Sequence, residues 1–80
     1  MDIAKLVHMA NQIGTHFAAE PDPEIAREGI AQHLAAFWAP GMRQSLLDHL
    51  DGEGGGDLLP IVREALDAHR RRLAGRRIPA

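Results

Sequence analysis

Apolar side chains recur every three or four residues along most of this chain, and that spacing restricts its possible folds more than any other feature. No stretch alternates apolar and polar residues with the period of two that a half-buried strand shows. Tyrosine is absent, valine is scarce and thirteen alanines are spread along the sequence, which favours helices over strands. We therefore expect an all-α fold, a small helical bundle of about four helices.

Two aspartates mark where the first two helices should begin. Asp2 is the expected N-cap of a helix that runs to about Ala19 and ends before Pro21. Asp22 is the expected N-cap of the second helix. Pro23 suits the first helical position because a proline has no N–H to leave unpaired there.

Proline and glycine divide the second half of the chain. Pro40 is expected to end the second helix and to begin a third, which runs to about Leu50. Residues 51–57, DGEGGGD, are predicted to be a flexible linker. The fourth helix is expected from about Leu58 to Leu73, with Asp57 as its N-cap.

The second helix carries two apolar stripes, separated by about 120°. They contain Ala26, Ile30, Leu34 and Phe37 in one, and Ile25, Gly29 and Ala36 in the other. So wide an apolar surface indicates a helix with contacts on two sides. Trp38 lies about 100° from Phe37 on an ideal helix, so the two rings should not enter one pocket. We expect Phe37 to join Phe17, Ile30 and Leu34 in the core.

Length and composition also bear on function. Eighty residues without cysteine form one small domain with no disulfide and no thiolate metal ligand. No apolar run approaches the roughly 20 residues of a membrane span, and the N-terminus lacks the pattern of a secretory signal, so we expect a cytoplasmic protein. A core this small leaves little stability in reserve, and a partner that covered more apolar surface would add to it.

Charge is unevenly distributed. The net charge is −2, but residues 1–68 carry four basic and eleven acidic side chains, whereas residues 69–80 carry five arginines and no acid. We expect a helical domain over residues 1–74, with Gly75 as C-cap, and a flexible basic tail over residues 75–80. The arginines of residues 70–77 leave a nucleic-acid-binding protein as an alternative, which the acidic body disfavours.

The sequence offers little for catalysis or metal binding. Its histidines are never three or four residues apart, the spacing that two metal ligands on one helix require; they are His8, His16, His33, His49 and His69. The glycine-rich segment lacks both nucleotide-binding patterns. Ser45 lies one helical turn from His49, a proximity that is common by chance. We expect no catalytic, cofactor-binding or metal-binding residue.

Two pairs of residues are better suited to an interface. Trp38 and Arg43 flank the Pro40 turn, and tryptophan and arginine are the types most enriched among the residues that dominate binding at interfaces. The alternative for the tryptophan is that it caps the core of the bundle. Asn11 and Gln12 are ordinary surface amides unless another chain covers them. The candidate partner-binding residues are Asn11, Gln12, Trp38, Met42 and Arg43.

Several segments resemble the delta subunit of NAD-dependent, molybdenum-containing formate dehydrogenases. They are KLVHMANQIGTHF (5–17), GIAQHLAAFWAPGMR (29–43), SLLDHL (45–50) and DLLPIVREAL (57–66). The most specific are the MANQI run of residues 9–13 and the HL-x-x-FW-x-P-x-MR run of residues 33–43. The family usually has an arginine where this chain has Gly41, so a charged contact at that turn would depend on Arg43 alone.

The resemblance implies a non-catalytic accessory subunit that packs on the alpha subunit and supports assembly, stability or retention of its molybdenum cofactor. In that family the alpha subunit binds bis-molybdopterin guanine dinucleotide, and other subunits carry iron–sulfur clusters and FMN. A transient, chaperone-like factor for cofactor insertion is the alternative within the family. For the accessory subunit that packs on the alpha subunit, Trp38, Met42 and Arg43 would be the anchors. Asn11 and Gln12 would supply hydrogen bonds.

Overall fold

The computed structural model describes residues 2–53 and 55–74, and within them it contains helices and no strand. The helices are α1 (Ile3–Phe17), α2 (Pro23–Phe37), α3 (Pro40–Glu53), α4 (Pro60–Ala68) and α5 (Arg70–Leu73). The prediction of a small all-α fold is confirmed. None of these helices is long and apolar enough to cross a bilayer.

The first two helices begin as predicted. The carboxylate of Asp2 accepts a hydrogen bond from the backbone N–H of Ala4 at 3.1 Å, and that of Asp22 accepts one from Glu24 at 2.9 Å. Pro23 occupies the first turn of α2. Each cap pairs one of the N–H groups that a helix start otherwise leaves unbonded.

The second half of the chain differs from the prediction in three places. Helix α3 continues to Glu53, so the segment predicted to be a linker begins within a helix. Helix α4 begins at Pro60, not at Leu58, because a residue that precedes proline is kept out of the helical region, and Leu59 has φ −60° and ψ 146°. Its N-cap is therefore Leu59, and the assignment of Asp57 as N-cap was wrong.

The predicted fourth helix is also interrupted. At His69 the backbone leaves helical geometry, with φ −117° and ψ 29°, and the short helix α5 follows. The expected C-cap at Gly75 and the expected tail over residues 75–80 lie outside the described residues.

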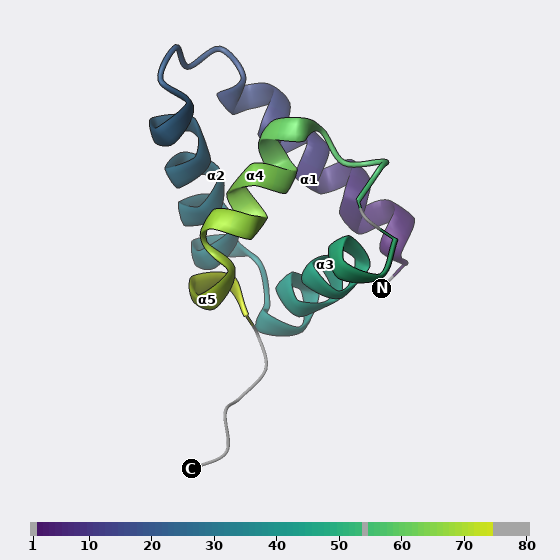
Figure 1. Cartoon of the computed structure of the whole chain (residues 1–80). Coiled ribbons are helices and arrows are strands. Elements are labelled where there is room, and N and C mark those ends of the chain that lie inside the picture. Colours follow the sequence, from purple (N-terminus) through teal and green to yellow (C-terminus); the bar gives the residue numbers. More distant parts are fainter. Residues whose placement is uncertain (1, 54, 75–80) are drawn as a thin grey trace.

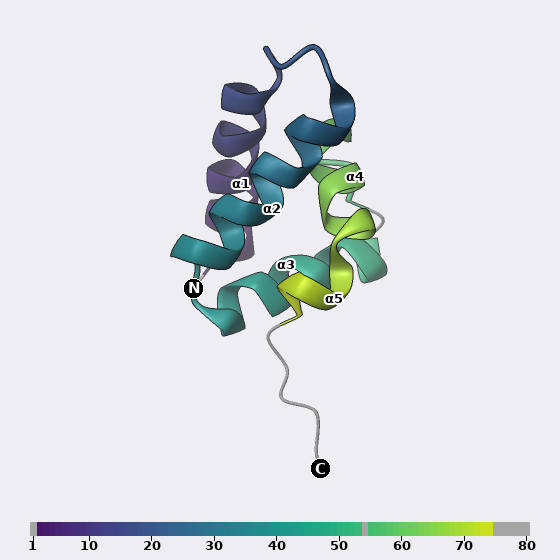
Figure 2. The same cartoon turned by 90° about the vertical axis from the view of Figure 1, so that its left-hand side faces the viewer.

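Helix α2 is central to the arrangement, since it packs against each of the other four helices (Figures 1 and 2). Close packing of α1 on α4 depends on Gly14, where an added Cβ would lie 2.5 Å from a methyl group of Val62. The core draws buried side chains from every helix and includes Leu6, Ala10, Ile30, Leu34, Leu46, Leu47, Val62, Leu66 and Leu73.

Of the two adjacent aromatic residues, Trp38 is buried and Phe37 is exposed. Trp38 is 7% exposed and belongs to the core, whereas Phe37 is 75% exposed, so the prediction that Phe37 is a core residue was wrong. The cause is the end of α2. Trp38 follows its last residue with an extended backbone, φ −93° and ψ 140°, and the angular spacing of an ideal helix no longer applies to its side chain. Ile30 and Leu34 are buried as expected, and Phe17 is half-buried.

Candidate interaction surface

The outward side of α2 presents the most exposed large apolar side chains in the described part of the chain. Phe37 is 75% exposed and Ile25 is 55% exposed. Ala36 is exposed as well. The two large side chains are twelve residues apart, which is about 18 Å along a helix axis. We call Ile25, Ala36 and Phe37 the α2 outer face.

Ile25 and Ala36 are the part of the second apolar stripe that the chain does not cover itself, whereas Phe37 is the last residue of the first stripe. The middle of the stripe is occupied by α1, because the ring of Phe17 packs on Gly29 so closely that an added Cβ would lie 2.4 Å from its Cε1 atom. Ile25 and Ala36, on the two sides of that contact, remain exposed. The first stripe is buried at Ile30 and Leu34, and the second is covered inside the chain at Gly29, so α2 does make contacts on two sides.

The ring of Phe37 has one aromatic neighbour. The imidazole of His33, one helical turn earlier, lies with its ring centroid 4.9 Å from that of Phe37 at an interplanar angle of 46°. Such a contact restricts the orientation of the exposed ring. An aromatic side chain that is already oriented loses little conformational entropy when a partner covers it.

The three predicted anchors around Pro40 are held by the chain itself to different degrees. The ring of Trp38 is buried in the core and Met42 packs partly against it. Arg43 is half-buried, with its Nη1 donating to the carbonyl oxygen of Arg72 at 3.5 Å. Its Nε is buried and has no hydrogen-bond partner among the described residues. Met42 and Arg43, which are half-buried, therefore keep more exposed area for a partner than Trp38, which is buried.

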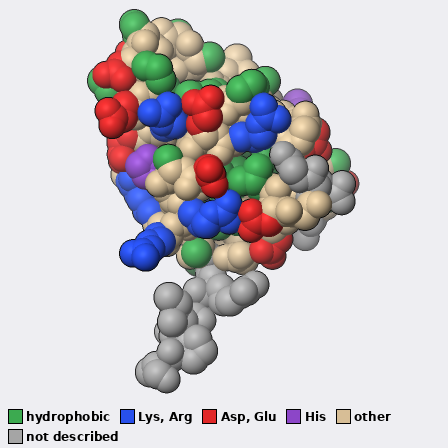
Figure 3. All heavy atoms as spheres, in the orientation of Figure 1, with side chains coloured by type: hydrophobic (Ala, Val, Ile, Leu, Met, Phe, Trp, Pro, Cys, Tyr) green, Lys and Arg blue, Asp and Glu red, His purple; other side chains and the backbone are tan. Residues whose placement is uncertain are grey.

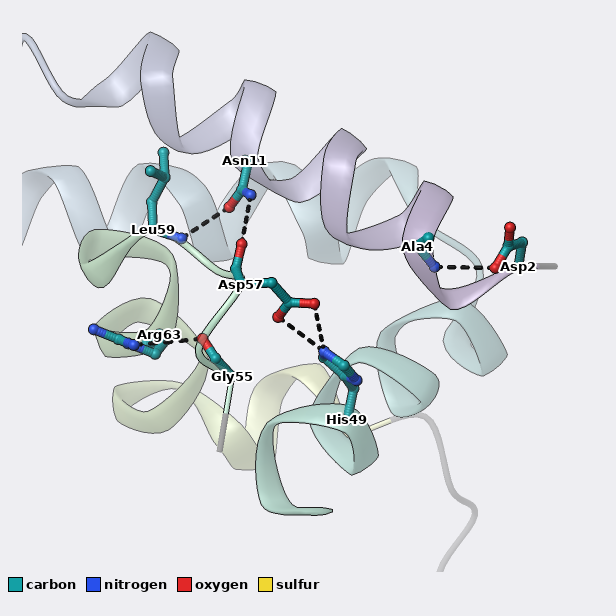
Figure 4. Close-up of polar contacts among 8 residues, drawn as sticks. All are labelled: Asp2, Ala4, Asn11, His49, Gly55, Asp57, Leu59 and Arg63. Carbon is teal, nitrogen blue, oxygen red and sulfur yellow. Dashed lines mark hydrogen bonds and ion pairs between the residues drawn. The ribbon is translucent and has the colours of Figure 1, made fainter. Parts of the chain in front are cut away.

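Asn11 and Gln12 differ in their surroundings, and Figure 4 shows those of Asn11. The side-chain amide of Asn11 donates to the carbonyl oxygen of Asp57 at 3.0 Å and accepts from the backbone N–H of Leu59 at 2.9 Å. Asn11 therefore fixes the chain just before α4 onto α1, and both ends of its amide are used. Gln12 is exposed.

Two residues of the predicted linker, Gly55 and Asp57, are also held in place (Figure 4). Gly55 is buried with φ +68°, a conformation that favours glycine, and its carbonyl oxygen accepts a hydrogen bond from Nη1 of Arg63 at 3.4 Å. The imidazole of His49 lies 2.9 and 3.1 Å from the two carboxylate oxygens of Asp57. This hydrogen bond lowers the pKa of Asp57. Pattern reasoning missed the pair because its eight-residue separation fits no helical spacing.

Two of the arginines near the C-terminus pair with acids of the same chain. Arg70 contacts Asp51 at 2.9 Å and Asp67 at 3.2 Å, and these hydrogen bonds raise its pKa. Arg72 contacts Glu28 at 2.7 Å, which lowers the pKa of that carboxyl. Acidic and basic side chains lie close together over the face that carries α4 (Figure 3). Pairing of these two arginines within the chain weakens the nucleic-acid alternative, while Arg71 is exposed and Arg76 and Arg77 lie outside the described residues.

No group of three or more histidine, aspartate or glutamate side chains in the described residues is arranged to hold a metal ion. Ser45 is exposed, and the imidazole of His49 binds Asp57. What the described residues offer is surface for contact.

Of three comparisons with known proteins, one found a match. The model of the family described as NADH-dependent formate dehydrogenase delta subunit FdsD matches residues 5–66. A search of curated proteins found no match, and a search of solved structures found none either. The matched segment includes all of α2 and α3 and most of α1 and α4.

Proposed function

This chain belongs to the family of NADH-dependent formate dehydrogenase delta subunits, and from that premise we propose that it is a non-catalytic accessory subunit. Its partner in this proposal is the alpha subunit, the one that carries the molybdenum cofactor. The role is to support assembly, stability or cofactor retention in a cytoplasmic complex. Bis-molybdopterin guanine dinucleotide, iron–sulfur clusters and FMN would be carried by other subunits. For the clusters the sequence gives a reason, since it has no cysteine to ligate them.

The observation that supports this proposal most directly is the exposure of Phe37. An aromatic ring that is 75% exposed on a chain with only three aromatic residues leaves apolar area in water without benefit to the fold. Covering it would remove that area from water and add to the stability of a small core. We propose that the α2 outer face packs on the alpha subunit, with Gln12, Met42 and Arg43 as further candidate contacts.

The test compares two truncations of exposed apolar side chains. The full-length chain carrying Phe37→Ala, and separately Ile3→Ala, is mixed with formate dehydrogenase purified from a strain that lacks it. Ile3 is 36% exposed on α1 and serves as the matched control. We expect Phe37→Ala to weaken binding by a factor of roughly 10 to 30, the effect of losing an aromatic contact worth about 1.5–2 kcal/mol. Equal binding of the wild type and both variants would remove the α2 outer face from the interface.

The alternative of a transient factor is separated from a permanent subunit by stoichiometry. One delta chain for each alpha chain in the mature enzyme supports the permanent subunit. Molybdenum per alpha chain and formate-dependent NAD reduction, measured in enzyme purified without this chain, decide whether cofactor retention depends on it. Full metal content and full turnover would leave stability as the remaining role.

A further inference from the structure

The guanidinium group of Arg43 is poorly satisfied where it lies. Its Nε is buried without a hydrogen-bond partner among residues 2–53 and 55–74, and the bond from Nη1 to the carbonyl oxygen of Arg72 is 3.5 Å long, at the outer limit for such a bond. A buried donor of a charged group without an acceptor is unfavourable and uncommon in folded proteins. Arg43 is therefore placed to bind an acceptor that the described part of the chain does not supply.

Helix α5 lies against this guanidinium and is only four residues long. An isolated helix of that length is not stable by itself, so α5 depends on its contacts with α2 and α3. One of these contacts is apolar, the buried side chain of Leu73. Others are polar and exposed: Arg72 binds Glu28 at 2.7 Å and also binds Gln32. Ion pairs at exposed positions contribute little to stability.

The break at His69 separates α5 from α4, so α5 can move without unwinding α4. The family match ends at residue 66, before α5 begins, whereas Arg43 lies inside it. Helix α5 thus lies wholly outside the segment that the family model matches.

We propose that α5 is a displaceable cover, and that Arg43 binds a carboxylate group of the partner when α5 moves away. The inference rests on the proposed function for the identity of that partner. An arginine donates from Nε and an adjacent Nη to the two oxygens of one carboxylate, a geometry that would pair the Nε atom now left without an acceptor. The partner group is therefore an aspartate or glutamate side chain on the alpha subunit.

The first experiment measures amide hydrogen exchange in the isolated full-length chain. The backbone N–H of Leu73 bonds to the carbonyl oxygen of His69, and that of Ala74 bonds to Arg70, so these two amides report whether α5 is in place. We expect both to exchange at least tenfold faster than the core amides of α1 and α2, through an opening that leaves the other helices folded. Exchange of these amides only together with the core would overturn the proposal.

The second experiment compares Arg72→Gln with Arg71→Gln in binding to dehydrogenase that lacks this chain. Both variants lose one positive charge on α5, but Arg71 has an exposed side chain and makes none of the contacts to Glu28 and Gln32. We expect Arg72→Gln to bind about two- to fivefold more tightly than Arg71→Gln, because the cover is released more easily. That gain should disappear when Arg43→Gln is added.

The outcomes separate this inference from the function on which it rests. A wild-type chain that does not bind the dehydrogenase refutes the proposed function, and the exchange measurement still decides whether α5 opens. A wild-type chain that binds, with Arg72→Gln no tighter than Arg71→Gln, refutes the cover alone. A gain that survives in the presence of Arg43→Gln shows that Arg43 is not the group that α5 protects, and overturns its assignment.

Discussion

Alanine substitutions at Phe37 and Trp38 should have opposite consequences although the two residues are adjacent. Removing the buried ring of Trp38, which is 7% exposed, should cost about 3–5 kcal/mol through lost burial and the cavity left behind. A domain of this size is stable by about 4–12 kcal/mol in total. Phe37→Ala removes a ring that is 75% exposed, and should change stability by no more than about 0.5 kcal/mol.

The assay is urea unfolding followed by far-ultraviolet circular dichroism, which does not depend on the tryptophan that one variant lacks. A change of midpoint with an unchanged slope reports a change in stability. Trp38→Phe, which keeps a ring at the buried position, should lie between the wild type and Trp38→Ala, and it keeps the comparison possible if the alanine variant does not fold. The reasoning is refuted if Phe37→Ala is as destabilising as Trp38→Ala. In that case residue 37 would be the buried one, and the α2 outer face would lose its principal side chain.

Three further substitutions test the contacts around the start of α4. Asn11→Ala should lower the unfolding free energy by about 1–3 kcal/mol in urea unfolding, because it leaves a part-buried backbone N–H without an acceptor, whereas Gln12→Ala should be nearly neutral. Gly55→Ala should cost about 1–2 kcal/mol in the same assay because of the positive φ, and Gly56→Ala, where an added Cβ meets nothing within 4 Å, should not; equal effects would contradict this. Asp57 has a pKa below its ordinary value of 3.8 in the folded chain, so its contribution to stability is complete well above that value and is lost as the pH falls through the folded pKa. Asp57→Asn should therefore be less stable than the wild type at pH 7 and should lose less stability between pH 5 and pH 3; parallel pH profiles would refute this.

Much of the fold followed from local signals in the sequence. Capping aspartates and prolines act over three or four residues, so Asp2, Asp22 and Pro23 identified the starts of α1 and α2 without knowledge of the tertiary structure. A local signal also identifies the start of α4. Pro60 keeps Leu59 out of the helical region, so the helix begins at Pro60.

The candidate site was less predictable because it depends on where a helix ends. Angular positions assigned on an ideal helix hold for Ile30 and Leu34 inside α2 but fail one residue after Phe37, where the backbone becomes extended. Contacts that join residues more than forty positions apart, such as that of Asn11 with the chain before α4, leave no periodic signal at all. The wide apolar surface of α2 could thus be predicted from the sequence. The exposure of Phe37, the main side chain of the α2 outer face, could not.

The central position of α2 affects how a bound partner would be held. This helix packs against each of the other helices in the described chain, so its exposed side chains stand on an element that the core supports. A partner that covered Phe37 would therefore contact a side chain whose backbone is anchored by several neighbouring helices, and little reordering of α2 would be needed for binding.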